Sequence, residues 1–170
     1  KQKLKLLYII QCLMEKTDEE HAVTTQEIID YLALQGITAE RKSIYTDIDL
    51  LTDFGMDIIK KPGRSGGYTL ASRQFELAEL KLLVDAVQSS KFITTKKSRE
   101  LIGKLETLCS KYEATQLHRQ VVVTNRNKAV NENIYYNVDI IYNAIAENVK
   151  IQFQYFEWDV SKEMKLRRDG

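Results

Sequence analysis

Residues 56–70, MDIIKKPGRSGGYTL, constrain the fold more than any other stretch of this chain. The apolar residues at its start predict a strand, the glycine-rich residues 62–67 predict a turn, and residues 67–70 predict a returning strand. A phosphate-binding P-loop would need a helix opening with Lys and Ser or Thr after the glycines, whereas here a strand follows. The segment therefore predicts a short β-hairpin with a basic turn.

The segment before the hairpin predicts a helix with a thin apolar stripe. In ERKSIYTDID, residues 40–49, Ile44 and Ile48 fall on one side of a helix drawn at about 100° per residue. The opposite side and the flanks carry hydrogen-bonding residues: Arg41, Lys42, Ser43, Tyr45, Thr46 and Asp49. Such a face is either plain solvated surface or a surface that recognises a partner.

Two further helices precede this one. Apolar residues recur at helical spacing over residues 3–16. Thr24 and Glu27 have the spacing of a capping box, and they open a second helix that Gly36 ends. The helix with the polar face then ends before Gly55. The resulting order of helix, helix, turn, helix and hairpin is the layout of a winged helix-turn-helix.

The charge of residues 1–73 is distributed unevenly. Ten basic and eleven acidic residues give a net charge of −1, which by itself argues against binding to DNA. However, basic residues gather on the hairpin and at the start of the third helix, while most acids lie in residues 15–20 or late in helices. Affinity for phosphate depends on the cations near the contact. We therefore expect modest DNA affinity that falls steeply with salt.

The geometry of helix-turn-helix proteins assigns roles to these residues. The N-terminal part of the recognition helix contacts base edges, through Arg41, Lys42, Ser43, Tyr45 and Thr46. Arg or Lys can pair with guanine, and the methyl group of Thr46 can contact thymine. Asp47 is expected to be structural and to hold a neighbouring basic side chain, because a carboxylate facing phosphate would repel it.

Phosphate contacts are expected from two other places. The start of the second helix offers backbone N–H groups at Thr24, Thr25 and Gln26. The hairpin would follow the DNA backbone with Lys60, Lys61, Arg64 and Ser65, and Arg64 could enter a narrow minor groove.

The rest of the chain predicts helices and a strand. Helical spacing recurs at residues 77–87, 101–108 and 133–148. The three valines at 121–123 are strand-like but too few to settle residues 112–131. Residues 150–156 alternate polar and apolar, which predicts a strand with one buried face. Because a lone strand forms no sheet, we expect its partners beyond Gly170 or in another chain.

The expected fold class is therefore mainly α with a small β component. Residues 1–73 would form a winged helix-turn-helix of three helices plus a β-hairpin wing. Residues 74–148 would form a helical linker or dimerisation region, and residues 149–170 would begin a β domain. Since the chain begins with Lys and stops soon after a strand-like run, we expect a fragment of a longer protein.

Several function classes are disfavoured. The formal charge of +1 gives no protein-wide attraction to nucleic acid or membrane, and no run reaches the ~18 apolar residues of a membrane span. Cys12 and Cys109 lie in apolar helical patterns, so we expect buried thiols in a reducing cytoplasm rather than a disulfide. With only His21 and His118 besides, no zinc-spaced cluster can be drawn, and we expect no metal, no cofactor and no enzyme.

The run ERKSIYTDIDLLTDFG, followed by the hairpin sequence, resembles the winged-helix domain of the WYL family of bacterial transcriptional regulators, which is DeoR-like. The matching positions are Arg41, Lys42, Ser43, Ile44, Tyr45, Asp47, Ile48, Leu51, Gly55, Gly66, Gly67 and Tyr68. Thr46 departs from the pattern, since many relatives carry Arg there, which implies one phosphate contact fewer. The later run IIYNAIAENVKIQFQYFEWD resembles the entry into the WYL domain, a small Sm-like β-barrel. The Trp-Tyr-Leu motif would lie beyond Gly170, so Trp158 is not part of it.

The resemblance implies a homodimer that binds double-stranded DNA. It also implies an effector, either a small molecule or a nucleotide or nucleic acid, bound by the missing part of the WYL domain, with the middle helices as the link. Two alternatives remain open. One is a winged helix used for protein–protein docking without DNA. The other is an enzyme with a regulatory winged helix, as in bifunctional biotin ligases, although the glycine/arginine loop and following Lys of such an enzyme are not seen here.

Overall fold

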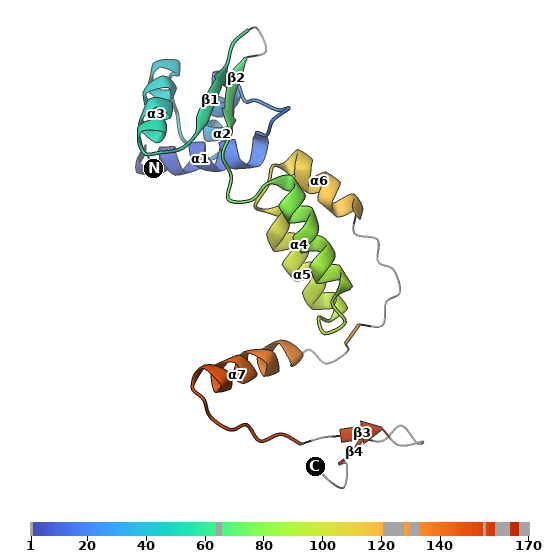
Figure 1. The fold of residues 1–170 in the computed structure, drawn as a ribbon. Coiled ribbons are helices and arrows are strands. Elements are labelled where there is room, and N and C mark those ends of the chain that lie inside the picture. Colours follow the sequence, from blue (N-terminus) through green and yellow to red (C-terminus); the bar gives the residue numbers. More distant parts are fainter. Residues whose placement is uncertain are drawn as a thin grey trace. The chain divides into compact units, whose positions relative to one another are not determined.

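The computed structural model describes residues 2–63, 66–120, 128–129, 133–154, 156–158 and 164–166. Within these residues the chain forms seven α-helices and two small antiparallel sheets of two strands each (Figure 1). This confirms the expectation of a mainly helical fold with a small β component. The chain divides into two compact units, Lys1–Lys128 and Ala129–Gly170.

The first part of the first unit, which we call the α1–β2 module, has the expected order of elements. Its elements are η1 (Gln2–Leu4), α1 (Lys5–Lys16), α2 (Thr25–Leu34), α3 (Arg41–Asp53), β1 (Ile58–Lys61) and β2 (Gly67–Leu70). α1 packs on α2, α2 packs on α3, and the hairpin contacts both α1 and α3 (Figure 1).

Local signals explain where these helices begin and end. Both halves of the capping box between Thr24 and Glu27 are formed at the start of α2, as the spacing predicted. Gly36 follows α2 with φ of 70°, and Gly55 follows α3 with φ of 107°. Residues with a side chain rarely adopt such angles, so glycine at these two positions ends each helix at low conformational cost.

A continuous core holds the module together. The residues with no exposed surface include Ile9 and Leu13 of α1, Ile28 and Leu32 of α2, and Ile44 of α3. Each such side chain contributes about 1.5–3 kcal/mol when it is removed from water. Ile48 and Leu51 complete the buried stripe of α3. The opposite side of α3 is exposed to solvent, as the helical spacing predicted.

The hairpin is fixed to the loop before α2. Its strands pair antiparallel, with Ile58 opposite Leu70 and Lys61 opposite Gly67. Val23 forms an additional bridge to Tyr68 on the free edge of β2. A Cβ atom at Gly67 would lie 2.3 Å from the Val23 carbonyl oxygen, so this close approach requires glycine.

The rest of the first unit is a bundle of three helices, the α4–α6 bundle. It consists of α4 (Leu77–Ser89), α5 (Thr95–Glu106) and α6 (Lys111–Gln120). Its separate core is built from Leu80, Val84, Ile102, Cys109 and Leu117. α6 resolves part of the sequence whose assignment was open, while the strand-like residues 121–123 lie outside the described residues.

The second unit contains α7 (Ile134–Ala146), β3 (Phe156–Trp158) and β4 (Met164–Leu166). α7 confirms the helix expected there, and it ends where Asn148 takes a left-handed conformation with φ of 54°. The side chains of Ile140 and Ile145 are 60% and 70% exposed. Within the described residues of this unit, α7 therefore buries little of its apolar surface.

The predicted strand at residues 150–156 differs from the structure in two respects. Residues 151–154 are not in a strand, and β3 begins only at Phe156. Its partner is β4 of the same chain, with Phe156 opposite Leu166, rather than a segment beyond Gly170 or in another chain. A partner that is close in sequence costs little loop-closure entropy, and the alternating residues of β4 suit an antiparallel pair.

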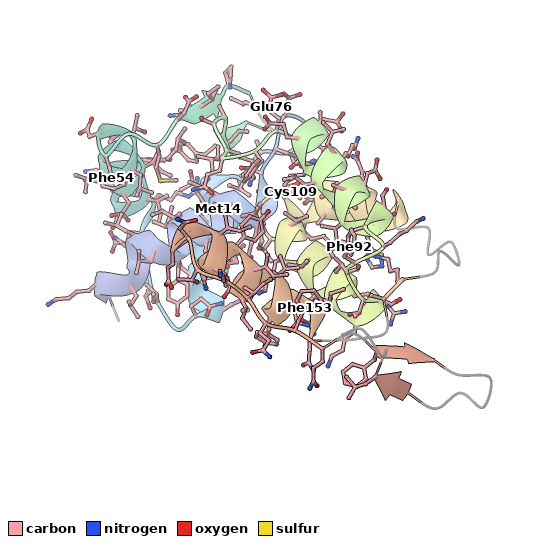
Figure 2. All side chains as sticks on the ribbon, turned by 60° about the horizontal axis from the view of Figure 1, so that its bottom comes forward. Met14, Phe54, Glu76, Phe92, Cys109 and Phe153 are labelled. Carbon is pink, nitrogen blue, oxygen red and sulfur yellow. The ribbon has the colours of Figure 1, made fainter. Side chains whose placement is uncertain are left out.

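Both cysteines are buried and free, as expected, and Cys109 lies among the side chains of the α4–α6 bundle (Figure 2). Burial raises the pKa of each thiol to about 11, so both are protonated at neutral pH. Within the described part of the chain, no helix is long and apolar enough to cross a membrane. In the same residues, no cluster of His, Cys, Asp and Glu could hold a metal ion.

Candidate nucleic-acid interface

The outward face of α3 presents most of the residues expected to contact bases. Arg41, Lys42 and Thr46 are exposed, and Tyr45 is 41% exposed. Glu40 occupies the N-cap but makes no side-chain capping hydrogen bond, and no acid lies in the first turn. The start of α3 is therefore positive, both from its two basic side chains and from the helix dipole.

Ser43 is placed differently from the other four residues. Its hydroxyl accepts a hydrogen bond from Lys5 Nζ of α1, and its side chain is partly buried. Lys5 Nζ also lies 2.7 Å from Asp47 Oδ2 in an ion pair whose side chains are only 14% and 10% exposed. Asp47 thus faces inward and holds a basic side chain, as expected, while Ser43 orients α3 on α1.

The N-terminus of α2 is largely occupied by its own capping box. The Glu27 carboxylate accepts from Thr24 N at 2.7 Å and from the Thr24 hydroxyl at 2.9 Å. The Thr24 hydroxyl in turn accepts from Glu27 N. Of the three predicted phosphate donors, Thr25 and Gln26 retain backbone N–H groups of the first turn, which have no acceptor within the helix. The negative charge of the Glu27 carboxylate disfavours phosphate binding at this end of α2.

A side-chain contact joins the starts of α2 and α3. Arg41 Nη2 donates to Gln26 Oε1 at 3.3 Å, and Gln26 Nε2 donates to Asp30 Oδ1 at 3.0 Å. Gln26 and Arg41 are both exposed. The residue predicted to contact phosphate and the residue predicted to contact a base edge therefore lie side by side on one surface.

The two lysines of β1 point to opposite sides, as successive strand residues do. Lys60 is exposed, and its Nζ lies 5.7 Å from the centre of the Tyr45 ring on α3. Lys61 is partly buried and donates from Nζ to the carbonyl oxygen of Glu19 at 2.6 Å. Lys60 therefore joins the exposed face of α3, whereas Lys61 is turned toward the loop before α2. Arg64 and Ser65 lie outside the described residues.

Part of the module's negative charge lies away from α3, although Glu40, Asp49 and Asp53 are exposed on or beside that helix. Glu19 and Glu20, which follow α1, line a cleft together with Glu76 and Glu113 of the α4–α6 bundle region. The residues lining this cleft include none from α3. The exposed face of α3 is thus separated from this acidic group.

Sequence reasoning missed Lys5, which holds α3 through both Ser43 and Asp47. A signal was present, because Lys5 lies one helical turn before Ile9 on the buried stripe of α1. A cation at such a position needs a buried anion, and Asp47 lies on the inner side of α3.

The chain matches no protein-family model, no curated protein and no solved structure.

Proposed function

We propose that this chain is a sequence-specific DNA-binding transcriptional regulator and that its α1–β2 module is a winged helix-turn-helix. The observation that carries this proposal is the exposed face of α3, which presents Arg41, Lys42, Tyr45 and Thr46 beside Lys60 of the hairpin. In this arrangement α3 enters the major groove and the hairpin is the wing.

The residues of this face can have different roles in DNA recognition. Arg41 and Lys42 have the donors that pair with guanine O6 and N7, and Thr46 offers a methyl group to thymine. Lys60 carries a charge suited to phosphate, and its ammonium group lies against the Tyr45 ring, so the wing contacts α3 at this point. Lys61 contributes less than the sequence suggested, because its ammonium group already has an acceptor in Glu19.

Local charge supports the proposal despite the net charge of −1 over residues 1–73. The Lys5–Asp47 pair neutralises itself, and the acids of residues 18–20 face the cleft beside the α4–α6 bundle. Each phosphate that a Lys or Arg neutralises releases condensed counterions and adds about 0.9 to the slope of log K against log salt. We therefore expect DNA affinity with a measurable dependence on salt.

The resemblance to WYL regulators extends the proposal to regulation. A sensor of the Sm-like barrel type would respond to an effector, either a small molecule or a nucleic acid, and the α4–α6 bundle would link it to the DNA-binding module. A homodimer would place two recognition helices in successive major grooves, about 34 Å apart, on an operator with two-fold symmetry.

The test is fluorescence anisotropy of the chain with labelled genomic fragments, including the region upstream of its own gene, at low and moderate salt. The proposal predicts binding that weakens with salt and that prefers one fragment over an excess of bulk competitor DNA. Absence of binding at low salt, with a protein shown to be folded by circular dichroism, would contradict it.

A second candidate function is protein–protein docking by the same module. The observation that favours it is an apolar pair one turn apart near the end of α3, since Leu50 and Phe54 are 52% and 83% exposed. Figure 2 labels Phe54 just after the last turn of α3. Exposed apolar pairs of this kind contribute to protein interfaces. Folded protein that ignores DNA at every salt concentration would favour this function.

A further inference from the structure

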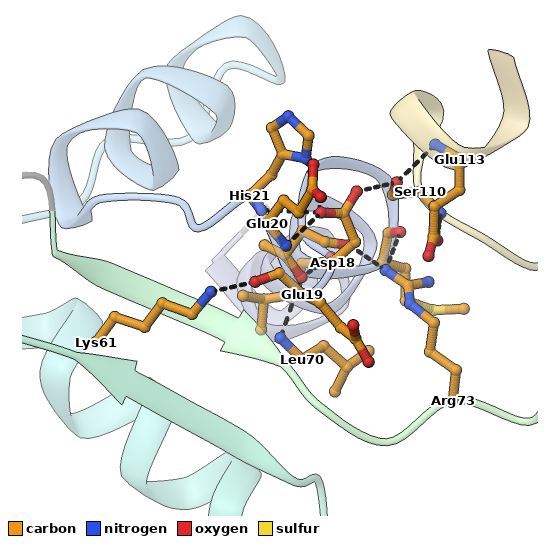
Figure 3. Close-up of polar contacts among 12 residues, drawn as sticks. Asp18, Glu19, Glu20, His21, Lys61, Leu70, Arg73, Ser110 and Glu113 are labelled. Atoms are coloured by element: carbon orange, nitrogen blue, oxygen red, sulfur yellow. Dashed lines mark hydrogen bonds and ion pairs between the residues drawn. The ribbon is translucent and has the colours of Figure 1, made fainter. Parts of the chain in front are cut away.

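The α1–α2 loop, residues 17–24, contacts the hairpin through the Val23–Tyr68 bridge and through two hydrogen bonds that involve side chains (Figure 3). Leu70 N of β2 donates to Thr17 Oγ1 at 3.0 Å, and this hydrogen bond is buried. Lys61 Nζ of β1 donates to Glu19 O at 2.6 Å. Together these bonds attach both strands of the hairpin to one short segment of chain.

The same loop contacts the first turn of α6. The Ser110 hydroxyl donates to Asp18 Oδ2 at 2.5 Å, and the two residues are 0% and 7% exposed (Figure 3). The ring of His21 stacks on that of Tyr112, with centroids 3.7 Å apart and planes inclined by 7°. A buried polar contact and an aromatic contact therefore join the loop to the α4–α6 bundle.

A single carboxylate, that of Asp18, connects the backbone of the α1–α2 loop to the start of α6. Its Oδ1 accepts from Glu20 N at 3.0 Å, from His21 N at 2.8 Å and from His21 Nδ1 at 2.7 Å, while Oδ2 is bound to Ser110. Ser110 also caps α6, because its Oγ accepts from Glu113 N at 3.1 Å. A displacement of the first turn of α6 therefore acts directly on the carboxylate that shapes the loop.

The contacts continue from the loop to the exposed face of α3. Lys61, which is held by the loop, is the strand neighbour of Lys60, whose ammonium group lies against the Tyr45 ring. A β-strand is stiff enough that its successive residues move together. Ser110 and Tyr45, which lie far apart in sequence, are thus connected by an unbroken series of contacts.

We propose that the α1–α2 loop is a relay in which Asp18 transmits displacements of α6 to the hairpin and to Tyr45 on α3. The relay is a property of the free protein. Only its consequence, that the α4–α6 bundle controls DNA affinity, rests on the proposed function. Energetic coupling between the first turn of α6 and the hairpin is the quantity that the experiment measures.

The test is amide hydrogen exchange, followed by NMR on the whole chain without DNA, in wild type and Ser110→Ala. Removal of the hydroxyl leaves Asp18 Oδ2 without its donor. The relay predicts that in Ser110→Ala the amides of Glu20 in the α1–α2 loop and of Leu70 in β2 exchange at least about tenfold faster than in wild type. The amide of Glu113, which Ser110 caps directly, should also exchange faster. Faster exchange confined to Glu113 and its neighbours in α6 would overturn the relay.

Thr94→Ala is the matched control, because Thr94 caps α5 as Ser110 caps α6. Its hydroxyl accepts from Lys97 N at 3.1 Å, and the residue is 3% exposed, but within the described part of the chain it makes no hydrogen bond to the α1–α2 loop. The control should speed exchange around Lys97 and leave Glu20 and Leu70 unchanged. An equal effect of both variants on Leu70 would point to general destabilisation and overturn the relay.

Coupling is reciprocal, which provides a second variant if Ser110→Ala does not fold. Asp18→Asn should speed exchange of the Glu113 amide in α6, and an unchanged rate there would overturn the relay. DNA anisotropy of the same proteins keeps the two proposals apart. Coupled exchange in a wild type that binds no DNA overturns the proposed function alone, whereas uncoupled exchange in a protein that binds DNA overturns the relay alone.

Discussion

Lys5 of α1 and Asp47 of α3 form an ion pair with 2.7 Å between Nζ and Oδ2, although they lie at distant positions in the sequence. The pair fixes the rotation of α3 on α1, and with it the face that α3 presents to solvent. The helix proposed to contact DNA is thus oriented by a charge on its opposite side.

Removing one partner of this ion pair should destabilise the protein more than replacing both partners with apolar residues. Lys5→Met leaves the Asp47 carboxylate mostly buried without its cation, which costs about 3 kcal/mol, the lower end for buried pairs because both side chains keep some exposure. The double variant Lys5→Met/Asp47→Leu should recover most of this loss. Urea unfolding of the two single variants and the double variant measures the difference, and a double variant as unstable as the sum of the singles would show that the charges do not interact.

Two glycines should respond to alanine with opposite signs. At Gly67 an added Cβ would lie 2.3 Å from the backbone of Val23, so Gly67→Ala must displace the hairpin and should lower stability. At Gly103, inside α5, an added Cβ meets nothing within 4 Å, so Gly103→Ala should stabilise by about 0.5–1 kcal/mol. Thermal unfolding of both variants checks the prediction, which a stabilising Gly67→Ala would contradict.

Asp18 should make part of the stability depend on pH. Burial by itself would raise the pKa of its carboxyl, but hydrogen bonds from Ser110, from His21 and from the backbone outweigh this effect and hold the pKa below its ordinary value of 3.8. A group whose pKa is lower in the folded state contributes stability that is present above pH 3.8 and is lost as the pH falls below it.

The stability difference between wild type and Asp18→Asn should therefore shrink as the pH falls from neutral to below 3.8. Urea unfolding at the two ends of this range measures it. Glu20→Gln is the control, since the Glu20 carboxylate makes no hydrogen bond within the part of the chain that the structure describes. A difference that stays constant with pH would show that Asp18 acts through its shape rather than its charge.

Glu27 should limit DNA affinity while it supports α2. Its carboxylate lies at the helix end where a phosphate would bind, and it accepts from Thr24 N. Glu27→Gln keeps an acceptor for that hydrogen bond and removes the charge, so it should raise DNA affinity at low salt and leave stability nearly unchanged. The measurement is DNA anisotropy of Glu27→Gln and of the control Glu79→Gln, which makes the same change in the capping box of α4. The control separates the local effect of Glu27 from a general change in net charge. Equal gains from both variants would contradict the local effect.

The features that sequence predicted well are those set by nearby residues. The capping box of Thr24 and Glu27, the glycine that ends α3 and the outward face of α3 all depend on spacings within a turn or two of helix. The assignment of α6 was left open although Ser110 and Glu113 have capping-box spacing, because among the side chains of α6 whose burial is described only Leu117 is fully buried. Its polar composition hid the helical pattern.

The features that sequence could not predict depend on distant partners. The position of Lys5 on the buried stripe of α1 indicates that it needs an anion, but nothing near Ser43 shows that Lys5 will bind its hydroxyl. Likewise, nothing near Lys61 shows that its ammonium group will donate to Glu19. Strand alternation does place Lys60 and Lys61 on opposite sides, but which side faces α3 is decided by how the hairpin packs. The partner of β3 was predicted wrongly because β4, Met164–Leu166, has only three residues, too few for their alternation to predict a strand.

The central claim, that the exposed face of α3 contacts DNA bases, is tested most directly by comparing Arg41→Ala, Lys60→Ala and Arg99→Ala in DNA anisotropy. Arg41→Ala should weaken the preferred fragment by about 1–3 kcal/mol more than random DNA, and Lys60→Ala should weaken both alike and lower the salt slope by about 1. Arg99 is an exposed arginine of α5, so Arg99→Ala makes the same charge change away from α3 and should leave affinity unchanged. Equal losses from Arg41→Ala and Arg99→Ala would contradict the claim.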